Sequence, residues 1–136
     1  LNLLIRENLD VVLYSPSKIR SFDTIEVENL HNLSTHVSLT YYIDYNDPRV
    51  KNLLMKYRAL FNTEPTQFAY QGYDIASYFI ELCSKYGKDW QKYLPHEEKS
   101  MLQSTFKCMQ QGEGGYVNHG VRRIVYEKDW TISKVR

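Results

Sequence analysis

The sequence contains little glycine and proline and no long hydrophobic run. Only 6 Gly and 4 Pro occur among its 136 residues, which argues against a collagen-like or low-complexity chain. No segment approaches the roughly 18 consecutive apolar residues of a membrane-spanning helix. The length and a hydrophobic share of 43% are typical of one globular domain, here residues 1–136, that can bury a core.

An excess of charge of either sign is also missing. The 17 Lys and Arg residues balance 16 Asp and Glu residues, so the sequence lacks the basic surface that binds nucleic acids. Tyrosine, by contrast, is abundant, with 12 residues. Tyrosines often line sites for sugars or amino acids, although packing at the edge of a core explains most of them.

The two cysteines, Cys83 and Cys108, do not form a CxxC motif. An oxidising compartment could join them in a disulfide, but small buried hydrophobic side chains are the simpler interpretation. The chain starts at Leu1 without an initiator methionine or a signal peptide, and its first apolar residues keep a helical spacing. We therefore expect it to be an excerpt of a longer protein.

Motifs that carry catalysis or hold metals are absent from the sequence. The four histidines lack the spacing of metal ligands, and neither a P-loop nor a GxSxG motif occurs. Gly112 to Gly115 lacks the third glycine of a dinucleotide-binding loop and is interpreted as a turn between strands. Asp44, Asp47 and Asp74 have no nucleophile and base beside them. We predict no enzymatic activity, no metal and no cofactor.

Two segments of the first third have the patterns of strands. Asp10 to Tyr14 is a short apolar run, typical of a buried parallel strand, and residues 36–45 alternate between two faces. A short helix with Ser21 as its N-cap is predicted between them.

Two stronger helices follow. Asp47 can cap a helix that starts at Pro48 and ends near Asn62, and Arg49, Lys51, Lys56 and Arg58 are predicted to face outward. Residues 72–86 are apolar over more than half of the helix circumference, so this helix is expected to pack on several sides.

The remaining chain predicts a short helix at 90–98 and then β structure. Residues 102–109, 121–126 and 130–135 have strand patterns, which indicates a small antiparallel unit. Because strands separated by helices favour a parallel sheet with helices on its faces, we predict an α/β fold. Its form would be a three-layer parallel sheet with a C-terminal antiparallel β ribbon.

Ligand sites of open α/β sheets lie beyond the carboxyl ends of the strands. Ser15 follows the first strand, and Tyr45 and Asn46 end the second. Tyr73 and Asp74 lie at a predicted helix start, where free N–H groups can hold an anion. These five residues are the candidate ligand-binding residues, although core packing, helix capping and turn formation are alternative roles for them.

The stretch Tyr57-Arg58-Ala59-Leu60-Phe61-Asn62-Thr63-Glu64-Pro65, followed by Ala69-Tyr70-Gln71-Gly72-Tyr73-Asp74-Ile75-Ala76, carries a family pattern. It resembles the C-terminal part of a type I periplasmic solute-binding protein of the amino-acid-receptor kind. The segment Tyr42 to Pro48, Tyr86-Gly87 and the glycine-rich ribbon are similar to the family as well. Residues 42–87 carry the specific part of the resemblance, and Ile75 before Ala76 departs from it.

The resemblance implies a two-lobed α/β protein that binds an amino acid or short peptide without covalent chemistry. Such a protein acts in the bacterial periplasm or cell envelope and delivers its ligand to an ABC-type membrane transporter, or senses it. A chain that holds only part of the two lobes would fold as a compact sub-domain or associate with a second copy.

Two other functions remain open at this point. The chain also resembles a Bacteroidetes-type envelope variant, in which such a domain follows peptidoglycan-binding LysM repeats. The alternative function is therefore a cell-envelope scaffold, associated with peptidoglycan, that has lost its ligand. An envelope hydrolase such as a peptidoglycan amidase is the weakest hypothesis, because no metal or nucleophile set can be assembled.

Overall fold

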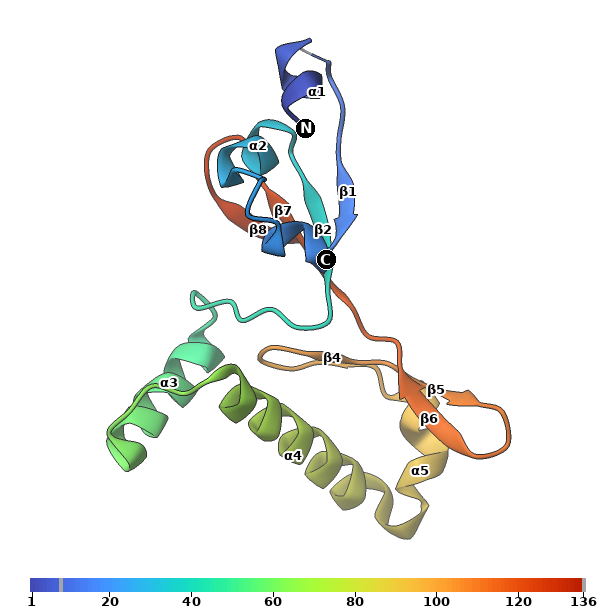
Figure 1. Ribbon diagram of the computed structural model, residues 1–136. Helices are drawn as coiled ribbons and strands as arrows, with labels where there is room; N and C mark the ends of the chain where they lie inside the picture. The colour runs from blue at the N-terminus through green and yellow to red at the C-terminus, as the bar shows by residue number, and fades with distance from the viewer. Residues whose placement is uncertain (8, 136) are drawn as a thin grey trace. The chain divides into compact units, whose positions relative to one another are not determined.

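The computed structural model describes residues 1–7 and 9–135, and the chain forms two compact units (Figure 1). Unit 1 contains Leu1–Thr40 and Val121–Arg136, and unit 2 contains Tyr41–Gly120. The chain therefore leaves unit 1 after its second strand, builds unit 2 without interruption, and returns to complete unit 1. That it belongs to a longer two-lobed protein stays a prediction.

Unit 1 is a four-stranded sheet with the strand order β1-β2-β7-β8. Strands β1 and β2 are parallel, whereas β7 pairs antiparallel with both β2 and β8. Three short helices belong to the same unit. The elements are α1 (Asn2–Arg6), β1 (Tyr14–Pro16), η1 (Ser17–Ser21), α2 (Val27–Asn32), β2 (His36–Leu39), β7 (Arg122–Tyr126) and β8 (Ile132–Val135).

The core of unit 1 is centred on strands β2 and β7. Val37 and Ile124 are register partners across β2 and β7, and both are fully buried. Leu30 and Leu33, from α2 and its C-cap, are buried as well. The alternating burial of β2 follows from the period of a strand, which points successive side chains to opposite faces.

Unit 2 consists of helices followed by two small hairpins, β3–β4 and β5–β6. In Figure 1 the hairpin β3–β4 runs beside the long helix α4. The elements are α3 (Pro48–Phe61), α4 (Gln67–Tyr86), η2 (Gly87–Asp89), α5 (Trp90–Tyr93), η3 (Leu94–His96), β3 (Lys99–Ser100), β4 (Thr105–Phe106), β5 (Cys108–Gln111) and β6 (Gly115–Asn118).

The predicted helix after Asp47 is confirmed. The Asp47 side chain accepts a hydrogen bond from the N–H of Arg49 at 2.8 Å, and Pro48 occupies the first turn. Asn62 ends the helix in the left-handed conformation, with φ 51°. In contrast, Ser21 is no N-cap, because it lies in η1 and α2 begins after Glu26.

Helix α4 begins at Gln67 and therefore earlier than predicted. Its buried side chains are spaced four residues apart and form one narrow stripe: Tyr70, Asp74, Tyr78 and Leu82. Ile75 and Ile80, which were expected to pack, are exposed. The expectation that α4 packs on several sides within this chain is wrong.

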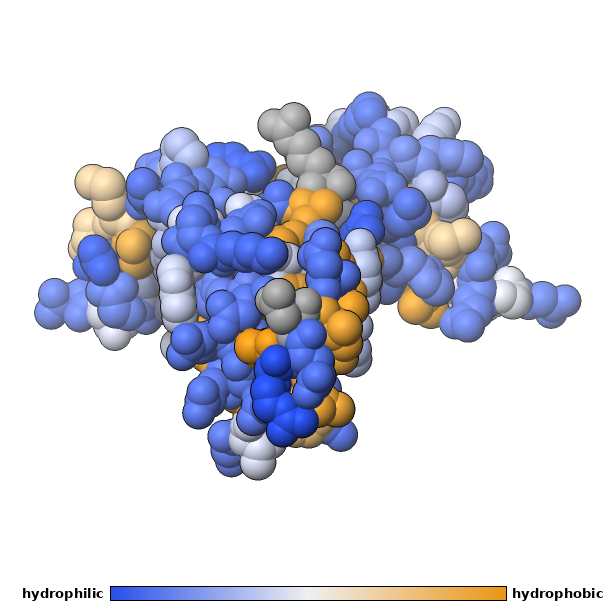
Figure 2. Space-filling view, turned by 90° about the horizontal axis from the view of Figure 1, so that it is seen from above, coloured by the Kyte–Doolittle hydropathy of each residue, from blue (hydrophilic) through white to orange (hydrophobic). Residues whose placement is uncertain are grey.

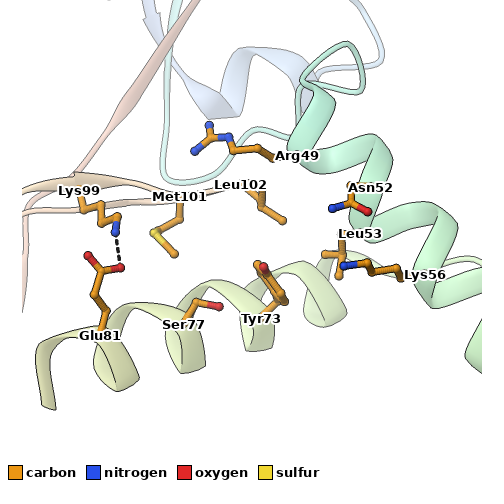
Figure 3. A pocket seen from close by; sticks show the side chains of 10 residues that line it. All are labelled: Arg49, Asn52, Leu53, Lys56, Tyr73, Ser77, Glu81, Lys99, Met101 and Leu102. Atoms are coloured by element: carbon orange, nitrogen blue, oxygen red, sulfur yellow. Dashed lines mark hydrogen bonds and ion pairs between the residues drawn. The ribbon is translucent and has the colours of Figure 1, made fainter. Parts of the chain in front are cut away.

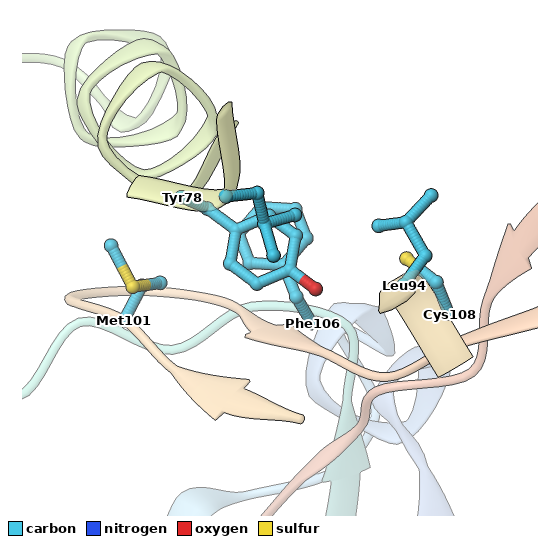
Figure 4. Packing of buried hydrophobic residues seen from close by; sticks show 6 residues of the cluster. Tyr78, Leu94, Met101, Phe106 and Cys108 are labelled. Carbon is cyan, nitrogen blue, oxygen red and sulfur yellow. The ribbon is translucent and has the colours of Figure 1, made fainter. Parts of the chain in front are cut away.

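The main core of unit 2 is built on the stripe of α4 (Figure 4). Tyr78 stacks on Phe106 of β4, with ring centroids 4.4 Å apart and planes 8° from parallel. Hydrophobic side chains from η3 and both hairpins complete it. The cluster contains Tyr78, Leu82, Leu94, Met101, Phe106 and Cys108.

The predicted three-layer parallel sheet is wrong. Only β1 and β2 pair in parallel, over three register positions, and every other strand pair is antiparallel in the described part of the chain. The prediction treated each helix as a crossover between neighbouring strands. Here α3 and α4 lead instead into hairpins of their own unit, so no parallel strand follows them.

Gly87, which ends α4, provides a test of helix termination. Its backbone has φ 57° and ψ −132°, a region that side chains with a Cβ avoid. We expect Gly87→Ala to lower the free energy of unfolding by about 1–2 kcal/mol. The matched change Gly72→Ala lies inside α4, where a Cβ meets no atom within 4 Å, and should raise it by about 0.5–1 kcal/mol. Urea denaturation of both variants measures the difference, and two effects of the same sign would contradict it.

Candidate ligand-binding site

Unit 2 contains a cavity of about 370 Å³ between α3, α4 and the β3–β4 hairpin (Figure 3). This volume is within the range of small-molecule sites. Residues three or four positions apart share one face of a helix, which places the lining side chains of α3 and α4 in rows. The lining consists of Arg49, Asn52, Leu53 and Lys56 from α3, Tyr73, Ser77 and Glu81 from α4, and Lys99, Met101 and Leu102 from the hairpin segment.

One part of the lining is apolar. Met101 and Leu102 are buried, and Leu102 packs with Val50 and Tyr70 in a second small core that Leu53 also contacts. This part of the cavity is continuous with the packed interior of unit 2.

The remaining lining is rich in cations. The lining contains three basic side chains, Arg49, Lys56 and Lys99, and a single carboxylate, that of Glu81. Lys99 is already paired with Glu81, as the dashed line in Figure 3 marks. The Arg49 guanidinium bonds to the Asp47 carboxylate at 2.7 Å, and this hydrogen bond raises the pKa of Arg49.

Lys56 differs from the other two cations. Neither its ammonium group nor the amide of Asn52 forms an ion pair or a hydrogen bond with the part of the chain that the structure describes. An ammonium group carries three donors and an amide carries both donors and an acceptor. These two side chains are therefore available for a ligand.

Of the five candidate residues, the structure brings one to this cavity. Tyr73 lines it from α4 and is 46% exposed. Tyr45 and Asn46 belong to the loop before α3 and do not line it. Tyr45 makes an edge contact with the Tyr70 ring, and the N–H of Asn46 donates to Asp44. Ser15 lies in β1 of unit 1, where its hydroxyl donates to its neighbour's carbonyl.

Asp74 has a different environment from the one expected. It is fully buried, and its carboxylate accepts hydrogen bonds from the N–H groups of Leu102, Gln103 and Ser104 at 2.9, 2.8 and 3.0 Å. Because α4 begins at Gln67, residues 72–74 lie inside the helix and offer no free N–H groups. The expected anion site at a helix start is therefore wrong, and the Asp74 carboxylate fixes the β3–β4 turn to α4.

Arg49 and Lys56 were missed as site residues because they were predicted to face outward. Positions 49, 52, 53 and 56 share one helical face, and this spacing was the available signal. The sequence contains no comparable signal for Lys99, whose position depends on the long-range bonds to Asp74.

The remaining polar residues do not form another centre. Among residues 1–7 and 9–135, no group of His, Cys, Asp and Glu is arranged to hold a metal ion. His31 is buried, with Nδ1 2.7 Å from the Glu127 carbonyl oxygen. Both cysteines are free, and Cys83 is exposed, so the expectation that both are buried is wrong.

The comparisons with known proteins identify no relative of this chain. No family model, curated protein or solved structure matches the chain. Within the described residues, no helix has the length and apolar character needed to cross a membrane.

Proposed function

We propose that the chain binds a small polar ligand with a carboxylate group, an amino acid or a short peptide, in the cavity of unit 2 and without covalent chemistry. The observation that carries the proposal is the Lys56 ammonium, which has no ion pair or hydrogen bond within residues 1–7 and 9–135 and which, with Asn52, lines a cavity of about 370 Å³.

The balance of charge favours an anionic group on the ligand. Lys99 and Glu81 neutralise each other, and Asp47 is bonded to Arg49, which leaves Lys56 as the uncompensated charge at the cavity. A carboxylate that accepts hydrogen bonds from Lys56 and Asn52 would form charge-assisted bonds. The apolar wall of Leu53, Met101 and Leu102 would then contact the nonpolar part of the ligand.

The lining also favours binding over catalysis. It contains no histidine or cysteine, and its one carboxylate, Glu81, is bonded to Lys99. Within residues 1–7 and 9–135, the hydroxyl groups of Ser77 and Tyr73 form no hydrogen bond with a carboxylate or histidine. These side chains can orient a ligand, but they do not form a nucleophile with its base.

For the biological setting, we propose a solute-binding protein of the bacterial cell envelope that passes its ligand to an ABC-type transporter. The support is the resemblance of residues 42–87, which include α3, α4 and six of the cavity's seven polar residues, all except Lys99. The alternative, a cell-envelope scaffold associated with peptidoglycan, is favoured by the exposed hydrophobic side chains of α3 and α4, such as Leu60, Phe68 and Ile80.

A thermal-shift screen against free amino acids, dipeptides and muropeptides tests the proposal. A ligand at 100 times its dissociation constant should add about 2.7 kcal/mol to the free energy of unfolding and raise Tm by several degrees. We expect Lys56→Ala to reduce the shift by weakening the carboxylate contact. Lys51→Ala is the matched control, because Lys51 is an exposed lysine of α3 outside the cavity.

Two results would contradict the proposal. One is the absence of any shift for the folded protein across the screen, which would favour the scaffold. The other is a ligand whose shift is the same in Lys56→Ala and in Lys51→Ala, which would place its binding away from this cavity.

A further inference from the structure

Helix α4 presents an uncharged apolar face to solvent on the side opposite its buried stripe. We call the residues Phe68, Gly72, Ile75, Ala76, Ile80 and Cys83 the free face of α4. Phe68 is 68% exposed, Ile75 41% and Ile80 65%. Figure 2 shows the opposite side of the molecule, where the surface is mostly hydrophilic.

All charged side chains of α4 lie away from this face. Asp74 is buried under the β3–β4 turn, Glu81 is paired with Lys99, and Lys85 bonds to Glu97 at 2.6 Å. From Phe68 to Cys83 the free face extends over about 22 Å at the rise of an α-helix. A contiguous apolar face of a helix normally packs against another surface, so this face is expected to have a partner.

Four residues of the free face are placed symmetrically about position 74, whereas Ile75 and Cys83 have no counterpart on it. In an antiparallel pair of α4 helices centred there, Phe68 would lie opposite Ile80 of a second copy, and Gly72 opposite Ala76. The small residues at the centre allow the two helix axes to approach closely, and the large residues on either side fill the flanking space. A face with this symmetry is complementary to itself, as a twofold interface requires.

We propose that the free face of α4 binds the same face of a second copy of this chain in an antiparallel homodimer. Because the face carries no charge, two copies meet without like-charge repulsion, whereas a charged partner would lose its hydration without gaining an opposite charge. All six residues are exposed, and their complete burial in both copies would reach at most about 1,000 Å², the lower bound for a specific interface.

Sedimentation equilibrium of the full chain, over a range of protein concentrations, tests the dimer. The chain is expected to dimerise reversibly, and Ile80→Glu is expected to raise the dimer dissociation constant by at least about tenfold, since it places two carboxylates in an apolar interface. Met55→Glu is the matched control, because Met55 is 70% exposed on α3 and lies outside the free face.

A second variant distinguishes an effect on dimerisation from an effect on folding. Gly72→Leu adds a side chain at an exposed position where a Cβ meets no atom within 4 Å, and it separates the helices at their closest approach. It should also weaken the dimer while the circular dichroism spectrum stays that of the wild type. A monomer at every concentration, or Ile80→Glu and Gly72→Leu chains that dimerise like Met55→Glu, would overturn the proposal.

Discussion

Replacing Asp74 by asparagine is expected to lower the free energy of unfolding by about 2–4 kcal/mol. The carboxylate accepts three hydrogen bonds from the backbone of residues 102–104 and has no access to water. An amide of the same size keeps one oxygen and turns its NH₂ group toward at least one N–H donor. That buried donor then loses its partner, and the loss of a buried partner costs more than a typical hydrogen bond contributes.

Urea denaturation of Asp74→Asn measures this loss, and Asp89→Asn is its control. Asp89 forms an exposed ion pair with Lys92 after α4, so its replacement should change the free energy of unfolding by less than about 0.5 kcal/mol. If Asp74 were a ligand residue only, Asp74→Asn would keep its stability and lose ligand binding. A stable Asp74→Asn chain would therefore refute the structural role assigned here.

The contrast between α3 and α4 explains how much of the fold was predictable from sequence. The ends of α3 are fixed by local chemistry, a capping aspartate, a proline in the first turn and a left-handed asparagine, and such signals act within a few residues. The start of α4 is marked less strongly, since its N-cap residue, Thr66, makes no capping hydrogen bond with its side chain and no proline occupies the first turn. The predicted start at Gly72 was therefore displaced, and Asp74 was assigned to a helix terminus.

The sheet was less predictable because strand pairing is decided between distant residues. Val37 of β2 pairs with Ile124 of β7 after the whole of unit 2 has intervened, and nothing near either residue specifies that partner. The same holds for the cavity. Tyr73 was found from its place in a motif, whereas Lys99 reaches the cavity only because distant backbone groups bind Asp74.

The second large effect is expected at Tyr78. Tyr78→Ala should lower the free energy of unfolding by about 3–5 kcal/mol, because it removes the ring that stacks on Phe106 and leaves a cavity in the core. Tyr78→Phe retains the ring and removes only the hydrogen bond from the hydroxyl to the Glu97 carbonyl, which is 2.8 Å long. Its cost should be about 1 kcal/mol, so the difference between the two variants measures the packing of the ring.

Because Tyr78 ionises, its burial can also be tested through the pH dependence of the free energy of unfolding. Burial, with smaller contributions from Cys108 and Glu97, raises the pKa of Tyr78 from 10.0 to about 12. The folded chain therefore holds this proton more tightly than the unfolded chain. The resulting stability is complete below pH 10 and is lost as the pH rises toward 12. Tyr78→Phe lacks the proton, so its free energy of unfolding should fall less steeply over that interval than that of the wild type. Equal slopes in the two proteins would mean that the Tyr78 hydroxyl reaches water in the folded state.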